Sequence, residues 1–139
     1  MNNTVVSSLA AILTTALLAA VSPASAGNSV VGEVRLVIEN RSDEPLRCIA
    51  IVAHFLTKEA GTIETGDSHS IDFELYEDGG LAQGIFQGNA VFIENLRCGA
   101  DTGWTTTSAD IPLDLLRESN GATVTAQCRI APRVTCDMR

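Results

Sequence analysis

Four cysteines constrain the fold of this 139-residue chain more than any other feature: Cys48, Cys98, Cys128 and Cys136. An even number of cysteines in an oxidising compartment indicates disulfides, here two, with three possible pairings. We expect Cys128 to pair with Cys136, because residues 131–133 predict a turn that places these two cysteines opposite each other. Cys48 and Cys98 then form the second disulfide. In the chain-entropy treatment the shorter bridge contributes about 2.5 kcal/mol to stability and the longer one about 4 kcal/mol.

The compartment is indicated by residues 1–26, which have the pattern of a secretory signal peptide. A polar opening precedes an apolar run at residues 9–21, and Ala24-Ser25-Ala26 supplies small residues for cleavage. The run is shorter than the roughly 20 residues that a membrane-spanning helix needs. The opening lacks Lys and Arg, which leaves an uncleaved anchor as the alternative. We therefore expect cleavage near Ala26, a periplasmic or extracellular location, and no membrane span in the mature chain.

The charge of the chain is acidic, with a formal net charge of −8 at pH 7. A nucleic-acid-binding protein needs a basic surface to displace counterions, so the composition argues against nucleic acid as a partner. Residues 58–78 hold seven acidic residues and one basic residue. This segment predicts an acidic face that docks a protein partner with a basic surface. The alternative is a solvated surface without a partner.

The pattern of apolar residues after position 26 predicts one mainly β domain at residues 27–139. Alternation of apolar and polar residues indicates strands at 34–38 and 71–76, and a nearly continuous apolar run at 46–56 indicates a central strand covered on both faces. Further strands are expected around Ile63 and at 90–98, 123–130 and 134–138, a polar loop at 99–108, and one short helix at 111–118. Glycines at 79, 80, 84 and 88 indicate a flexible loop or a bulged strand.

Six or seven short strands with one helix are typical of a small two-sheet β-sandwich or a small barrel. A Cys48–Cys98 bridge between two buried strands would make the architecture broadly similar to an immunoglobulin-like sandwich. Trp104 follows both cysteines instead of lying between them, so the similarity is one of architecture only.

The search for catalytic and metal-binding residues yields few candidates. The chain has no Gly-x-Ser-x-Gly motif and only two histidines, His54 and His69, so we expect no enzymatic activity and no cofactor. The cysteine spacing contains no Cys-x-x-Cys pair and matches no zinc signature. A metal site for Cu²⁺ or Zn²⁺ made by His54, Asp67 and His69 is the alternative function, because Asp67 and His69 project to one side of an extended chain.

Four residues are the predicted partner-binding positions: Asp72, Glu74, Tyr76 and Trp104. The first three are the outward positions of the alternating strand at 71–76, and Trp104 lies in a loop between glycine and threonines, where a tryptophan can anchor an interface. The sequence therefore predicts a small exported, non-catalytic binding or accessory protein that docks a partner through an acidic face and a tryptophan-containing loop.

Overall fold

The fold is described by a computed structural model that covers residues 29–52 and 56–139. The predicted signal peptide lies outside these residues. The strands are β1 (Val30–Asn40), β2 (Leu46–Val52), β3 (Leu56–Ile63), β4 (Ser68–Tyr76), β5 (Leu81–Phe86), β6 (Asn89–Ala100), β7 (Ala109–Ile111), β8 (Thr123–Ile130) and β9 (Val134–Met138). The helical elements are short: η1 (Asp101–Gly103), α1 (Trp104–Thr107) and α2 (Asp114–Glu118).

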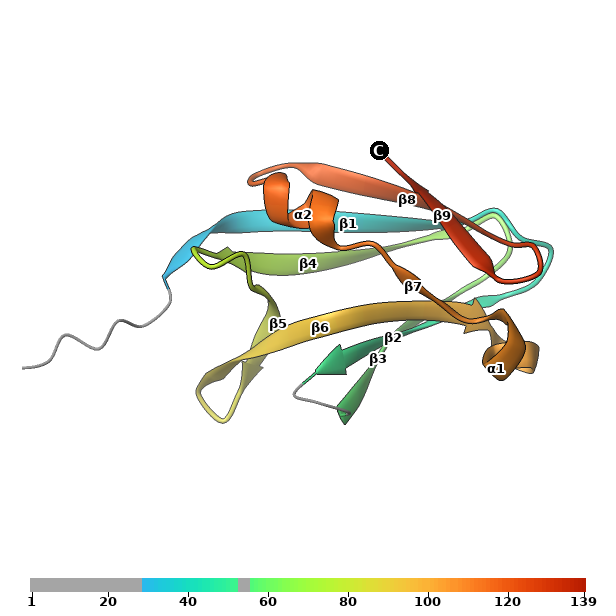
Figure 1. Cartoon of the computed structure of the whole chain (residues 1–139), viewed down its shortest axis with the longest axis horizontal. Helices are drawn as coiled ribbons and strands as arrows, with labels where there is room; N and C mark the ends of the chain where they lie inside the picture. Colours follow the sequence, from blue (N-terminus) through green and yellow to red (C-terminus); the bar gives the residue numbers. More distant parts are fainter. Residues whose placement is uncertain (1–28, 53–55) are drawn as a thin grey trace, which may run out of the picture.

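The strands form one sheet of nine, in the order β3-β2-β6-β5-β4-β1-β8-β9, with β7 attached to β6. The pairings are antiparallel except for β1 with β8, which is parallel. The sheet bends strongly, so that β1, β4 and β8 lie over β2, β3 and β6, and β5 runs from one layer to the other (Figure 1). The expectation of a mainly β chain with one helix in the 111–118 region is confirmed, the helix being α2.

The core lies between the two layers and is built by the predicted alternation. In β1, Val34, Leu36 and Ile38 are buried, and in β4 the same holds for Ile71 and Phe73. Leu36 is opposite Ile71, and Val34 is opposite Phe73. Because side chains alternate between the faces of a strand, this register sends the apolar residues of both strands into the space between the layers.

The prediction of one strand over residues 46–56 is wrong. β2 ends at Val52, and Leu56 begins β3, which returns antiparallel so that the two residues face each other. Only alternate residues of β2 (Leu46, Cys48 and Ala50) are buried, while the other face is partly exposed. The sequence from 46 to 56 contains no Gly, Pro, Asn or Asp, so the apolar residues of two successive strands appear as one run.

Of the four glycines predicted to form a flexible loop or a bulged strand, Gly84 lies at a bulge in β5, Gly79 and Gly80 lie in the β4–β5 connection, and Gly88 lies in the β5–β6 turn. The pairing of β5 with β6 shifts register between Ala82 and Ile85, where Gly84 has a φ of +78°. Gln87 and Gly88 then connect β5 to β6 with φ values of 50° and 80°. Two successive positive φ angles are typical of a tight type I′ hairpin turn.

Both predicted disulfides are confirmed. Cys48 is bonded to Cys98, and Cys128 to Cys136. In each case the cysteines lie directly opposite each other on neighbouring strands, β2 with β6 and β8 with β9, at a Cα–Cα distance of 4.1 Å. The long bridge therefore joins adjacent strands of one sheet, whereas the disulfide of an immunoglobulin domain joins two sheets. The two disulfides indicate an oxidising setting, as in a periplasm or outside the cell.

A buried asparagine completes the end of the molecule that carries the disulfides. The side chain of Asn40 is fully buried, and its Nδ2 donates to the carbonyls of Glu44 and Ile63, each at 2.9 Å. Its Oδ1 accepts the N–H of Ser42 at 2.9 Å. Asn40 thereby joins the end of β1, the β1–β2 connection and the end of β3. We call this region the disulfide end, defined by Asn40 and the four cysteines.

Candidate binding groove

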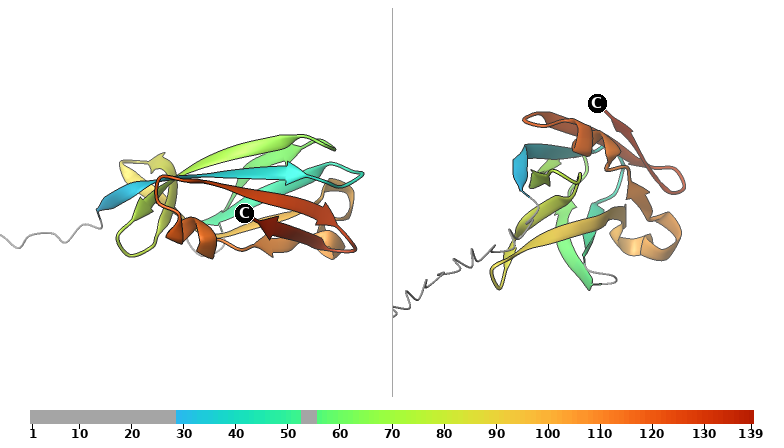
Figure 2. Two further views of the ribbon diagram at one scale, coloured as in Figure 1. Left: turned by 90° about the horizontal axis from the view of Figure 1, so that it is seen from above. Right: turned by 60° about the vertical axis from the view of Figure 1, so that its left-hand side comes forward.

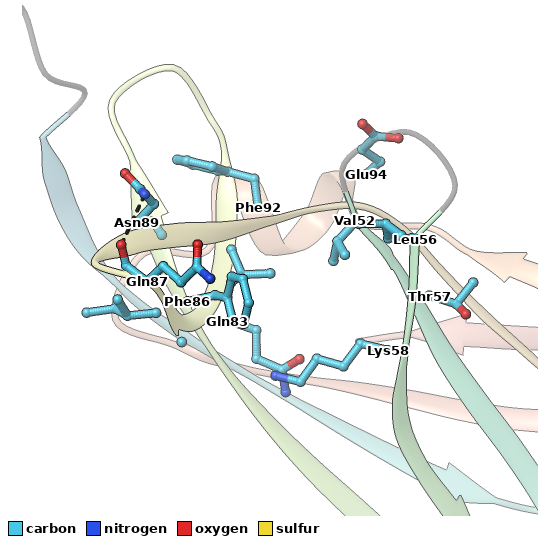
Figure 3. A pocket seen from close by; sticks show the side chains of 14 residues that line it. Val52, Leu56, Thr57, Lys58, Gln83, Phe86, Gln87, Asn89, Phe92 and Glu94 are labelled. Carbon is cyan, nitrogen blue, oxygen red and sulfur yellow. Dashed lines mark hydrogen bonds between the residues drawn. The ribbon is translucent and has the colours of Figure 1, made fainter.

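A groove of about 800 Å³ opens at the other end of the molecule, between the β5–β6 hairpin and the adjoining ends of β2 and β3 (Figure 3). It forms because the hairpin extends past its neighbours. β4 pairs with β5 only as far as Ala82, and β2 pairs with β6 only as far as Ile93. None of the described strands therefore pairs with the outer sides of the hairpin between Gln83 and Phe92.

The walls of the groove are mostly apolar and exposed to solvent. Leu56 is 66% exposed, Ile85 72%, Phe86 66% and Phe92 38%. Large apolar side chains gathered around a concave surface mark a binding site more often than single exposed ones do. The residues that line the groove are Val52, Leu56, Thr57, Lys58, Gln83, Gly84, Ile85, Phe86, Gln87, Asn89, Ala90, Val91, Phe92 and Glu94.

Two polar side chains point into the groove from facing strands, Lys58 from β3 and Gln83 from β5 (Figure 3). The Oε1 atom of Gln83 is buried and has no hydrogen-bond partner among the described residues. A buried polar atom without a partner is unusual, because desolvation is then not compensated. Within the described part of the chain Lys58 has no ion pair. The groove therefore combines apolar walls with two polar groups that a ligand could engage.

The predicted acidic face lies on the outer surface of β4, and part of its charge is neutralised. Asp72 forms an ion pair with Arg35 of β1, at 2.6 Å between Oδ1 and Nε. The hydrogen bond from Arg35, and then its charge, hold the pKa of the Asp72 carboxyl below its usual value. Glu74 lies opposite Glu33 of β1, and these carboxylates border a shallow depression of about 240 Å³. Gly84 lines both this depression and the groove, so the two are adjacent.

Tyr76 connects the acidic face to the wall of the groove. Its hydroxyl donates to Glu74 at 3.2 Å, and its ring packs edge-on against Phe92, with 4.8 Å between the ring centroids. Burial, and then the interaction with Glu74, raise the pKa of the Tyr76 hydroxyl above its usual value. Tyr76, the last residue of β4, therefore contacts both Glu74 of the acidic face and Phe92 of the groove lining.

Trp104 is not brought together with the other three predicted partner-binding residues. It begins α1, at the end of the molecule opposite the β5–β6 hairpin (Figure 2). Its ring covers Gly99 so closely that a Cβ there would lie 3.0 Å from the ring, and the Arg47 guanidinium lies 5.5 Å from the ring centroid. Arg47 in turn is paired with Glu59. The partly buried Trp104 thus covers the edge of β6, and the 99–108 region is the end of β6 followed by η1 and α1 instead of a loop.

The residues of the alternative metal site are only partly described. His69 lies on β4, with its ring beside Gly61, and Asp67 immediately precedes β4. His54 lies outside the described residues. Among residues 29–52 and 56–139, no three His, Cys, Asp or Glu side chains are grouped so as to hold a metal ion.

The groove residues were missed by sequence reasoning. The signal that could have found them is the turn at Gln87-Gly88 between two apolar pairs, Ile85-Phe86 and Val91-Phe92. Adjacent apolar residues on a two-stranded hairpin place apolar side chains on both faces, and one face is then left uncovered unless another element packs on it.

The comparisons add no relative to these observations: no protein-family model, no curated protein and no solved structure matches the chain. Over the described residues, no helix has the length and apolar character needed to cross a membrane.

Proposed function

We propose that this protein is an exported, non-catalytic binding protein and that its ligand is held in the groove at the β5–β6 hairpin. The observation that carries the proposal is the gathering of Leu56, Ile85, Phe86 and Phe92 around one concave surface. Covering a large apolar side chain contributes about 1.5–3 kcal/mol, so a ligand that fills the groove gains substantial affinity. The proposed export is supported by the two disulfides and by the signal-peptide pattern at residues 1–26.

The test uses N-phenyl-1-naphthylamine, an uncharged dye whose fluorescence rises in apolar surroundings. We expect the purified protein to bind the dye, and Phe86→Ser to weaken that binding about tenfold, because one aromatic contact is lost. The control is Val30→Ser, which removes a side chain that is 49% exposed but does not line the groove. Phe86→Ser should leave the thermal midpoint of unfolding unchanged, because Phe86 is mostly in solvent. Equal dye binding by all three proteins would contradict the proposal.

A second candidate function is the docking of a basic protein partner on the acidic face. It is favoured by Glu33 and Glu74, whose carboxylates lie directly opposite each other on β1 and β4. Like charges at such positions are unfavourable, and a cationic group of a partner would relieve the repulsion. A partner captured in this way should be lost from Glu74→Gln and released by salt, and salt-independent capture would contradict this function.

The architecture proposed alongside this function is a two-layer sandwich. It is supported by the pairing order, in which β3 and β9 are the two ends and no hydrogen-bonded ladder joins them among the described strands. A closed barrel would require such a ladder.

A further inference from the structure

We infer that the groove binds a long-chain carboxylate, the anion of an unbranched fatty acid, with its head group at Lys58 and its chain along Phe86 and Leu56. The inference rests on the proposed function, because it names the ligand class of the same groove. It combines three features of the described residues: the shape of the apolar wall, the unpaired cation and the unpartnered amide oxygen.

The apolar wall suits a flexible alkyl chain. Phe86 comes from the hairpin, and Val52 and Leu56 lie at the ends of β2 and β3 across the groove, whereas the Phe92 ring points to the same side of β6 as Glu94 (Figure 3). The volume of about 800 Å³ lies within the range of small-molecule sites. Because the groove is open along the hairpin, a longer chain can extend over more apolar surface without a clash at the far end.

The head-group position is defined by Lys58 and Gln83. A lysine ammonium has three N–H donors, so Lys58 can donate to a carboxylate and to the Oε1 of Gln83 at the same time. The buried Oε1 atom then gains the partner that it lacks among the described residues. The Gln83 amide N–H groups are donors for the same carboxylate. A bound carboxylate thus pairs with the Lys58 ammonium and with the Gln83 amide.

Charge complementarity selects an anion over a cation at this position. The chain as a whole is acidic, with a net charge of −8, yet the groove contains Lys58, the one basic residue of its lining among residues 29–52 and 56–139. The other titratable residue of the lining is Glu94, which points away from Lys58 on the other side of β6 (Figure 3). A carboxylate therefore meets a cation inside the groove, whereas a cationic head group at this position would be repelled by Lys58.

The experiment is equilibrium dialysis of the purified protein against radiolabelled dodecanoate at pH 8 and low ionic strength, below the concentration at which micelles form. We expect one dodecanoate per protein. Unlabelled dodecan-1-ol and dodecyltrimethylammonium, which share the chain, should compete at least tenfold more weakly than dodecanoate. Affinity should rise with chain length from octanoate to dodecanoate, by up to about fourfold per CH₂ where the chain is fully covered.

The matched variants are Lys58→Met and Lys58→Arg, since Lys58 is exposed and both changes keep a long, flexible side chain. Lys58→Met should lower dodecanoate affinity at least tenfold and abolish the preference over the alcohol, while naphthylamine binding persists. Lys58→Arg should retain the preference.

The outcomes separate this inference from the proposed function. If the naphthylamine dye binds the groove but dodecanoate does not, the binding groove stands and the ligand class is overturned. Dodecanoate binding that Lys58→Met leaves unchanged, or equal competition by the alcohol, also overturns it. Absence of both dye and dodecanoate binding removes the inference together with the proposed function.

Discussion

The disulfide end and the groove end use similar strands in opposite ways. At the disulfide end, two bridges link β2 to β6 and β8 to β9, and the buried Asn40 side chain joins β1 to the end of β3. At the groove end, the β5–β6 hairpin extends past its neighbours and leaves Ile85 and Phe86 mostly in solvent. Figure 2 shows the hairpin and α1 at opposite ends of the molecule.

This difference separates stability from binding. In a small domain the net stability is only about 5–15 kcal/mol, so two disulfides supply a large share of it. With strands held at one end, the other end can expose apolar side chains that contribute little to folding. The comparison predicts that changes at the disulfide end alter unfolding, and that changes at the groove end alter binding.

The largest expected effect comes from removing the disulfides one at a time. Replacing both Cys48 and Cys98 by alanine should lower the free energy of unfolding by about 4 kcal/mol, and replacing Cys128 and Cys136 by about 2.5 kcal/mol, because the first bridge closes the longer loop. Urea unfolding monitored by circular dichroism measures both. Equal losses would show that loop length does not set the contribution of these bridges.

The next effect is that of Asn40→Ala. It leaves the carbonyls of Glu44 and Ile63 and the N–H of Ser42 without their side-chain partner, and we expect a loss of about 3 kcal/mol. The matched control is Asn89→Ala at the hairpin, where the exposed amide makes one hydrogen bond of 3.3 Å within the turn. Similar losses in the free energy of unfolding from the two variants would contradict the proposed difference between the disulfide end and the groove end.

The smallest effect concerns the surface ion pairs between the ends. The hydrogen bond from Arg35 lowers the pKa of Asp72, so the folded protein binds fewer protons at this group than the unfolded chain does. The contribution of the pair is therefore present above the unfolded pKa, near 4, and is lost as the pH falls through the lower folded value.

Thermal unfolding of wild type and Asp72→Asn tests this sign. The difference in midpoint should be present at pH 7, shrink as the pH falls below about 4, and decrease in high salt. Glu77→Gln, on the exposed segment after β4, is the control for loss of one negative charge. A difference that grows toward acidic pH would contradict the assignment.

Much of the fold could be predicted from particular residues. The turn at 131–133 identified the Cys128–Cys136 pair, and elimination then gave the Cys48–Cys98 pair. The alternation in β1 and β4 placed their buried residues correctly. The division into β2 and β3 could not be predicted, because residues 46–56 form a nearly continuous apolar run without Gly, Pro, Asn or Asp.

The candidate site was less predictable than the fold. Asp72, Glu74 and Tyr76 do lie on the outer side of β4, as predicted, but Trp104 is at the other end of the molecule. Lys58 lies on β3, Gln83 and Phe86 lie on β5, and none of them belongs to a recognisable motif. Their proximity depends on how far each neighbouring strand continues.

By itself, the sequence determined the strand-rich class, the two disulfide partners and the acidic charge, because these follow from local periodicity, cysteine spacing and composition. Only the tertiary structure decided that the sheet is continuous, that Cys48 and Cys98 lie on adjacent strands, and that a groove opens beside the β5–β6 hairpin. The physical reason is that pairing between distant strands is set by which strands can bury their faces together. Where that pairing stops, at Ala82 and at Ile93, the apolar surface that remains uncovered is the groove.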